Sequence, residues 1–212
     1  MSDLMIYSFT VFMGLFAIMN PIANTPIFLA LTANDSPEVT RRVALKGLLL
    51  TFCLLASFAL LGLYIFEIFG IGLPAFRVTG GALVALIGYQ MLQGDNSSVH
   101  SPSEGDTQDS LQVALSVAVS PLAVPLLAGP GTIAAVMNFS AGKGAAELLV
   151  TLGAVAALCI ITYFFFVFGR GMVRFIGQSG LNVVTRMMGL ILAVIGVQML
   201  IDGLKAAFNL PA

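Results

Sequence analysis

The chain has 212 residues, of which 58% are hydrophobic and only 9% are charged. Soluble domains have roughly a quarter of their residues charged, so this composition excludes an ordinary soluble fold and indicates a protein embedded in lipid. The formal net charge is −1, with no basic cluster beyond Arg41 and Arg42. This excludes the electrostatic surface that a nucleic-acid-binding protein needs.

Six apolar stretches are each about as long as the roughly 20 residues that cross a hydrocarbon core. Their expected bounds are Leu4–Leu31, Val43–Phe69, Pro74–Leu92, Leu111–Phe139, Ala145–Phe168 and Leu181–Ile201. The sequence therefore predicts an all-α polytopic membrane protein with six transmembrane helices.

The first stretch contains the motif NPIANTPIF at residues 20–28. Pro21 and Pro26 each remove a backbone N–H donor and clash with the carbonyl four residues earlier. The carbonyls of Ala17 and Ile22 should therefore lose their helical partners. Because a freed carbonyl cannot face lipid, we expect this helix to be broken against protein or a watery cavity.

The second stretch ends near Glu67, an acidic residue among apolar neighbours. An acid inside a membrane suggests a proton relay, although a residue within a turn of the interface can simply reach water. Glu67 is the candidate for proton coupling, and Glu147 and Asp202 are expected to be surface groups. Cys53 and Cys159 lack a second Cys or a His at metal-ligand spacing, so we expect small buried side chains and neither a metal nor a cofactor.

The long polar stretch at residues 94–110 (GDNSSVHSPSEGDTQDS) is typical of a mobile linker. It separates a first three-helix unit, residues 1–93, from a second, residues 111–212, and the two units should form one membrane domain. The apolar stretches contain no pair of Asp residues and no Ser/His set, so enzymatic activity is not expected.

The fourth stretch contains the motif SPLAVPLLAGPGT at residues 120–132, in which Pro125 and Pro130 repeat the spacing of Pro21 and Pro26. Matched breaks in two halves are the best sequence pointer to a transport site, and two ordinary proline kinks are the alternative. The residues expected to line a shared substrate site are Asn20, Pro21, Asn24, Thr25, Pro26, Gly129, Pro130, Gly131 and Thr132.

This predicted site has no formal charge. The start of a half-helix carries roughly +0.5 and its end roughly −0.5 of a unit charge, which suits a zwitterion. A carboxylate would bind amides near Ile27 and Phe28 or near Gly131 and Thr132, and an ammonium group would bind released carbonyls. The small residues of both motifs should keep the substrate small.

The third and sixth stretches share a pattern, GALVALIGYQML at residues 81–92 and GLILAVIGVQML at residues 189–200. A three-helix unit crosses the membrane an odd number of times, so the second copy should be inverted, with a pseudo-twofold axis in the membrane plane. The small residues of both patterns should form close-packing surfaces, with Gln90 and Gln198 as interhelical hydrogen bonders.

The basic residues predict the orientation, because cytoplasmic loops carry an excess of Lys and Arg. One predicted face has Arg41, Arg42, Lys46, Arg170, Arg174 and Arg186, and the other has Arg77, Lys143 and Lys205. The first face should be cytoplasmic, and both termini should then lie outside.

The motifs at residues 20–28 and 121–133 and the segment Gly88–Leu92 resemble the MarC family of bacterial and archaeal inner-membrane proteins. The likeness covers nearly the whole chain. It implies six membrane helices, outside termini and a cytoplasmic central loop. The family is named for an association with multiple antibiotic resistance. The activity that the resemblance implies is transport of small neutral amino acids such as alanine and glycine, as in the similar SnatA transporters, near the LysE-type exporters.

The sequence therefore predicts a secondary transporter for small, zwitterionic neutral amino acids in the bacterial inner (plasma) membrane, with periplasmic termini. The direction of transport, coupling to protons or sodium and assembly as a homo-oligomer are left open. One rival is an exporter of another small metabolite or a drug. Another is a non-transporting membrane assembly or regulatory protein, which would need no polar cavity.

Overall fold

The computed structural model describes residues 3–33, 35–93, 127–140 and 142–208. These residues form helices and no strand, which confirms the predicted all-α class for the described part. The helices are α1 (Asp3–Met19), α2 (Pro21–Leu31), α3 (Pro37–Phe69), α4 (Leu73–Gln93), α6 (Pro130–Ser140) and α7 (Ala145–Phe208). The predicted linker at residues 94–110 and the start of the fourth predicted stretch, residues 111–126, lie outside the described residues.

Helix α7 consists of two long arms that meet at Gly177. The φ of 69° and ψ of 167° at Gly177 interrupt the helix in a region that residues with a Cβ avoid. We call Ala145–Gly177 the N-terminal arm and Ser179–Phe208 the C-terminal arm. The predicted stretches leave residues 169–180 between them, and the structure fills this interval with helix and a kink at one glycine.

Five helical stretches of the described chain are long and apolar enough to cross a membrane. They are Asp3–Leu31, Pro37–Gly62, Leu73–Gln93 and the two arms of α7. These match five of the six predicted stretches. From the remaining one, Leu111–Phe139, the structure describes α6 and the short segment before it.

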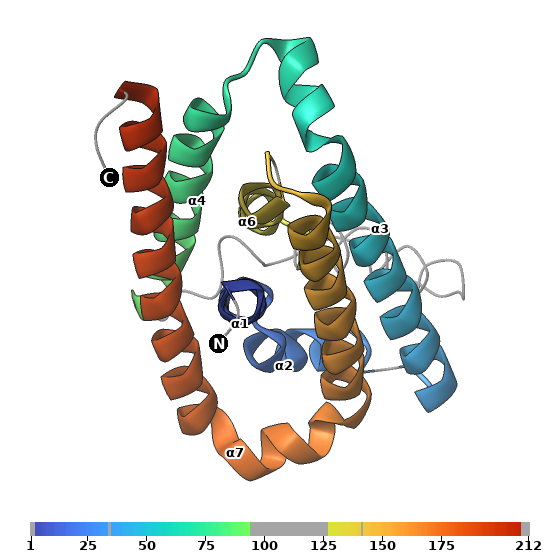
Figure 1. Ribbon diagram of the computed structural model, residues 1–212. Coiled ribbons are helices and arrows are strands. Elements are labelled where there is room, and N and C mark those ends of the chain that lie inside the picture. Colours follow the sequence, from blue (N-terminus) through green and yellow to red (C-terminus); the bar gives the residue numbers. More distant parts are fainter. Residues whose placement is uncertain (1–2, 34, 94–126, 141, 209–212) are drawn as a thin grey trace.

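The long helices surround the short ones. In Figure 1, helices α1, α2 and α6 lie between α4 with the C-terminal arm of α7 on one side and α3 with the N-terminal arm on the other. Contacts of α7 with α1, α2, α3, α4 and α6 agree with this arrangement. Helix α7 therefore connects all the other described helices.

Helix α4 and the C-terminal arm of α7 are in backbone contact. A Cβ added at Gly81 would lie 2.6 Å from the carbonyl oxygen of Gly196, and one added at Gly196 would lie 2.6 Å from the carbonyl oxygen of Gly81. Gly88 and Gly189 have the same reciprocal relation, at 2.6 and 2.8 Å. These pairs show that the two helices run antiparallel, and they confirm the predicted close-packing surfaces.

The glutamines near this interface do not behave as the sequence predicts. Gln198 donates its Nε2 to Oδ1 of Asp202, one turn along the same helix, at 2.8 Å. Gln90 has a buried Oε1 without a hydrogen-bond partner among the described residues. The prediction of an interhelical hydrogen bond is therefore wrong for Gln198, because an acceptor on its own helix lies within reach.

Candidate functional site

The first predicted stretch is broken at Asn20, between the end of α1 at Met19 and the start of α2 at Pro21. Asn20 has φ 36° and ψ 66°, and no other non-glycine residue in the described part has a positive φ. Pro21 has no N–H with which to continue α1, and its ring disfavours the helical conformation at the residue before it. Asn tolerates the left-handed region better than most residues with a Cβ. The predicted break is confirmed at Pro21.

Pro26 does not break the helix a second time. It lies inside α2, which continues from Pro21 to Leu31. A proline is tolerated inside a membrane helix where neighbouring protein accommodates the freed backbone group. The amides of Ile27 and Phe28 therefore belong to a continuous helix, and the prediction that they receive a substrate carboxylate is wrong. The amide end of this half-helix lies at Pro21 instead.

Polar side chains satisfy several backbone groups that the break exposes. Oδ1 of Asn20 accepts a hydrogen bond from the N–H of Ala23 at 3.2 Å, as an N-cap. Asn24 donates its Nδ2 to the carbonyl oxygen of Met19, at the end of α1, at 2.8 Å. These bonds join the end of α1 to the first turn of α2. Both asparagines are buried, with 3% and 5% of their surface exposed.

The side-chain amide of Asn20 also has an unused donor. Because Oδ1 accepts from Ala23, Nδ2 points away from that bond, and it is buried without a hydrogen-bond partner among the described residues. Leaving a buried donor unpaired costs about 1–3 kcal/mol, so most such groups in native proteins are paired. The break therefore holds an uncharged donor that a bound acceptor, such as a carboxylate oxygen, would satisfy.

Thr25 packs against α7. Its hydroxyl donates to the carbonyl oxygen of Pro21 at 2.6 Å. A Cβ added at Gly169 would overlap the methyl group of Thr25. One turn further along α2, the ring of Phe28 stacks on Phe166 with centroids 4.2 Å apart and planes 6° apart. The structure thus places Thr25 where it holds α2 on the N-terminal arm of α7.

Ala128 and Gly129 lie outside helix immediately before α6, and we call these two residues the second break. Gly129 is buried and accepts a hydrogen bond at its carbonyl from the N–H of Ile133 at 3.0 Å, so α6 begins immediately after it. Pro130 is exposed, and Thr132 is 4% exposed. The first turn of a helix leaves amides without intrahelical partners, here those of Gly131 and Thr132. Pro121 and Pro125 of the same motif lie outside the described residues.

Gly131 faces α4. A Cβ at Gly131 would lie 2.8 Å from Cδ1 of Ile87 and 3.7 Å from Cγ2 of Val84. Both are side-chain atoms of α4. Gly131 therefore provides close contact between α6 and α4, in addition to its amide in the first turn of α6.

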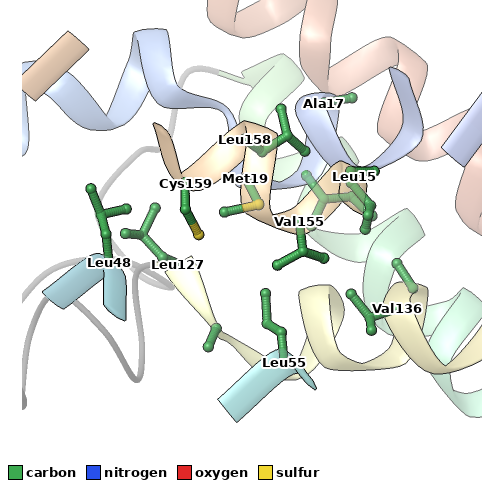
Figure 2. Packing of buried hydrophobic residues seen from close by; sticks show 14 of the residues in the cluster. Leu15, Ala17, Met19, Leu48, Leu55, Leu127, Val136, Val155, Leu158 and Cys159 are labelled. Carbon is green, nitrogen blue, oxygen red and sulfur yellow. The ribbon is translucent and has the colours of Figure 1, made fainter. Parts of the chain in front are cut away.

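The two breaks border one buried apolar cluster. Met19 at the end of α1 and Leu127 just before α6 are both 0% exposed and belong to this cluster. Figure 2 shows Cys159 of α7 between them, with Leu48 of α3 beyond Leu127. Within the described part of the chain, no hydrogen bond joins the polar groups of the two breaks. The structure therefore brings the breaks to one core without showing direct polar contact between them.

The remaining candidates lie away from the breaks. Glu67 is exposed on the last turn of α3. Cys159 is buried, as expected, whereas Cys53 is exposed, so the prediction that both cysteines are buried is wrong for Cys53. Cys53 lies on the outward face of α3, which apolar composition alone could not distinguish from the inward face.

No sequence pattern indicates the contact between Tyr7 and the end of α6. The hydroxyl of Tyr7 donates to the carbonyl oxygen of Phe139, and Nζ of Lys143 lies 4.5 Å from the centroid of the Tyr7 ring. A Cβ added at Gly14 would lie 3.1 Å from the Phe139 ring. These contacts hold α1 against α6. They depend on tertiary structure, and no local motif marks them.

These observations define a polytopic helical membrane protein whose first span is broken inside the protein. The MarC family integral membrane protein model matches residues 5–208. The UPF0056 membrane protein YvbG of Bacillus subtilis (strain 168) is 40% identical over 207 residues, which cover 96% of this chain and 98% of that protein. The UPF0056 membrane protein YhcE of Escherichia coli (strain K12) is 31% identical over 205 residues, covering 94% and 93% of the two chains.

A UPF0056 membrane protein of the archaeon Pyrococcus abyssi (strain GE5 / Orsay) is 37% identical over 199 residues, which cover 94% of each chain. No solved structure matches the chain. The chain belongs to the MarC family of integral membrane proteins. The resemblance that the proline motifs indicated is thus confirmed at the level of the family.

Proposed function

We propose that this protein is a secondary transporter of small neutral amino acids and that the break between α1 and α2 forms part of its substrate site. The observation that carries the proposal is the buried, unpaired Nδ2 of Asn20 beside two half-helix ends. Broken helices at substrate sites are a recurring device of secondary transporters.

The chemistry of the break suits a zwitterion. Nδ2 of Asn20 and the first-turn amide of Ile22 at the start of α2 favour a carboxylate, because the start of a helix carries partial positive charge. The carbonyl end of α1 favours an ammonium group. At the start of α6, Ile87 and Val84 of α4 pack closely on Gly131 and leave little volume for a substrate side chain there. These features favour alanine or glycine over larger or charged amino acids.

We further infer that the chain consists of two inverted three-helix repeats, with the sixth span supplied by the stretch that includes α6. The reciprocal contacts of α4 with α7 support this. Gly81 corresponds to Gly189 and Gly88 to Gly196 in the shared sequence pattern. A twofold axis turns the Gly81–Gly196 contact into the Gly189–Gly88 contact, and both contacts are present. The axis would pass between these antiparallel helices.

The orientation that we propose places both termini in the periplasm of a cell with an inner membrane. Arg41 at the start of α3 and Arg170 in α7 line the same groove, so these two basic residues of the face predicted to be cytoplasmic lie close together. A cysteine at Ser98, in a chain from which Cys53 and Cys159 have been removed, should resist an impermeant maleimide in intact cells. Rapid labelling would show that Ser98 lies outside the cell and that the orientation is the opposite of the one proposed.

The function is tested by counterflow of radiolabelled alanine and glycine in proteoliposomes that contain the purified protein. We expect uptake above that of protein-free liposomes, and we expect Asn24→Ala to weaken it. Ser8→Ala provides a matched control, because the exposed Ser8 hydroxyl donates to the carbonyl of Leu4 on its own helix, away from the break. Absence of counterflow for small neutral amino acids, alongside efflux of another metabolite or a drug, would replace the proposed substrate class.

A further inference from the structure

A groove of about 200 Å³ lies where the start of α3 meets α2 and the N-terminal arm of α7. It is separate from the break at Asn20. Its lining combines polar and apolar side chains. The polar lining residues are Thr40, Arg41 and Arg170, and the apolar ones are Leu29, Pro37, Val167 and Phe168.

Thr40 has an unusual hydroxyl. The residue as a whole is 9% exposed, and its Oγ1 is buried without a hydrogen-bond partner among the described residues. The carbonyl of Ser36, four residues earlier, accepts the backbone N–H of Thr40 at 2.9 Å but not its hydroxyl. The threonines whose hydroxyls do donate to the carbonyl four residues earlier are Thr10, Thr25, Thr32, Thr51, Thr79, Thr151 and Thr162. The Thr40 hydroxyl is thus left for a partner in the groove that it lines.

The groove attracts anions. The side chains of Arg41 and Arg170 are exposed, and neither forms an ion pair within the part of the chain that the structure describes. The first turn of α3 adds partial positive charge. Asp35 and Glu38 lie near that turn, but neither lines the groove. The charged groups of the groove are therefore both cationic.

The apolar lining residues indicate which anion fits. Phe168 is 64% exposed, and with Val167 it belongs to a membrane-spanning arm of α7. The volume of the groove is several times the roughly 30 Å³ that a water molecule takes in the liquid, so a phosphate group can enter. A ligand with an acidic phosphate and an attached hydrocarbon chain would match both the cationic and the apolar lining residues.

We propose that this groove binds the phosphate group of an anionic phospholipid. Arg41 and Arg170 contact the phosphate oxygens, the Thr40 hydroxyl donates to one of them, and an acyl chain lies along Val167 and Phe168. Guanidinium groups match phosphate geometry well, and basic pockets between membrane helices commonly hold anionic head groups. This site does not depend on the proposed transport function.

The test is native mass spectrometry of the delipidated protein with added phosphatidylglycerol, phosphatidylcholine or inorganic phosphate. We expect phosphatidylglycerol to be retained more than phosphatidylcholine. We also expect Arg41→Gln, Arg170→Gln and Thr40→Val each to lower that retention several-fold. Arg42→Gln and Thr51→Val are matched controls, because Arg42 does not line the groove and the Thr51 hydroxyl is bonded to Gly47.

The three ligands distinguish the possible sources of the phosphate. Inorganic phosphate that binds as tightly as phosphatidylglycerol, with the same dependence on Arg41 and Arg170, would overturn the lipid assignment in favour of free phosphate. Equal retention of phosphatidylglycerol by the wild type and all five variants would overturn the site itself. Circular dichroism and elution volume of each variant exclude misfolding as the cause of any loss.

Discussion

Two buried regions satisfy their backbone hydrogen-bonding groups in opposite ways. One is the contact between α4 and the C-terminal arm of α7, and the other is the junction between α1 and α2. In the first, uninterrupted helices satisfy their own backbone groups, and glycines let the two backbones touch. In the second, the backbone is interrupted at Asn20, and asparagine side chains replace part of the missing hydrogen bonding. Both regions are buried inside the protein.

The difference shows which region is suited to bind a ligand. At the glycine contact the two backbones leave no space for a ligand, and the unpaired polar atom near it, Oε1 of Gln90, is an acceptor that a carboxylate would not bind. The junction holds a buried donor, Nδ2 of Asn20, that no described residue satisfies. We therefore expect substitutions at the glycine contact to affect folding and substitutions at the junction to affect substrate binding.

Gly88→Val should have the largest effect. Its new side chain would meet backbone atoms of Gly189 and Ala193, which cannot move aside as a side chain can. Overpacking of this kind costs about 1–3 kcal/mol and sometimes more, so we expect a large loss of folded protein in thermal unfolding in detergent. Gly153→Ala is the control, because nothing lies within 4 Å of the added Cβ and α7 should be unchanged or slightly stabilised. Equal stability of Gly88→Val and wild type would contradict the backbone contact.

Two substitutions at Asn20 separate backbone conformation from side-chain chemistry. Asn20→Ala keeps a Cβ in the left-handed region and loses the N-cap, which together should lower stability by about 2 kcal/mol or more. Asn20→Gly removes the same side chain but suits the positive φ, so the free energy of unfolding should fall by only about a few tenths of a kcal/mol. Unfolding curves that rank the glycine variant below the alanine variant would show that the φ of Asn20 does not matter.

Asn24→Ala should have an intermediate effect. It removes the hydrogen bond to the Met19 carbonyl, which joins α1 to α2, and so should lower stability by about 1 kcal/mol. Weaker alanine counterflow should accompany this loss, because the end of α1 is then free to move. Counterflow kinetics identical to wild type would mean that the junction does not need this bond.

Glu67→Gln should have the smallest effect on folding, within about 0.5 kcal/mol, because the side chain is exposed at the end of α3. A role of Glu67 in proton coupling stays a prediction, and it requires that uptake by the variant no longer respond to an imposed pH gradient. An unchanged response would assign coupling to another group.

Residue type and spacing predict the features that depend on local chemistry. Length and apolarity predict five of the spans, although the end of one, Gly177, lies nine residues beyond its predicted end at Phe168. Pro21 predicts the break, because a missing N–H acts on the residues beside it. The repeated glycines predicted a close-packing surface on each of the two helices, but not that these surfaces pack against each other. In each case the determining interaction lies within a few residues of the motif or repeats along one helix face.

Features that depend on tertiary contacts could not be predicted in this way. Pro26 has the same chemistry as Pro21, yet α2 continues through it. Thr25 and Gly131 belong to the polar and small-residue motifs, but their neighbours, Gly169 and Ile87, are set by how α2 and α6 pack. No sequence pattern distinguishes Thr40 from the other threonines, because only the structure shows that its hydroxyl is unpaired.

The most direct test of the substrate site measures the thermal stability of purified wild type and Asn20→Gly with increasing alanine. A ligand that binds the folded state raises its midpoint of unfolding. We predict that alanine stabilises the wild type, that it does not stabilise the folded Asn20→Gly variant, and that leucine stabilises neither. Equal stabilisation of both proteins by alanine would contradict the account, because the substrate would then bind without the side chain at the break.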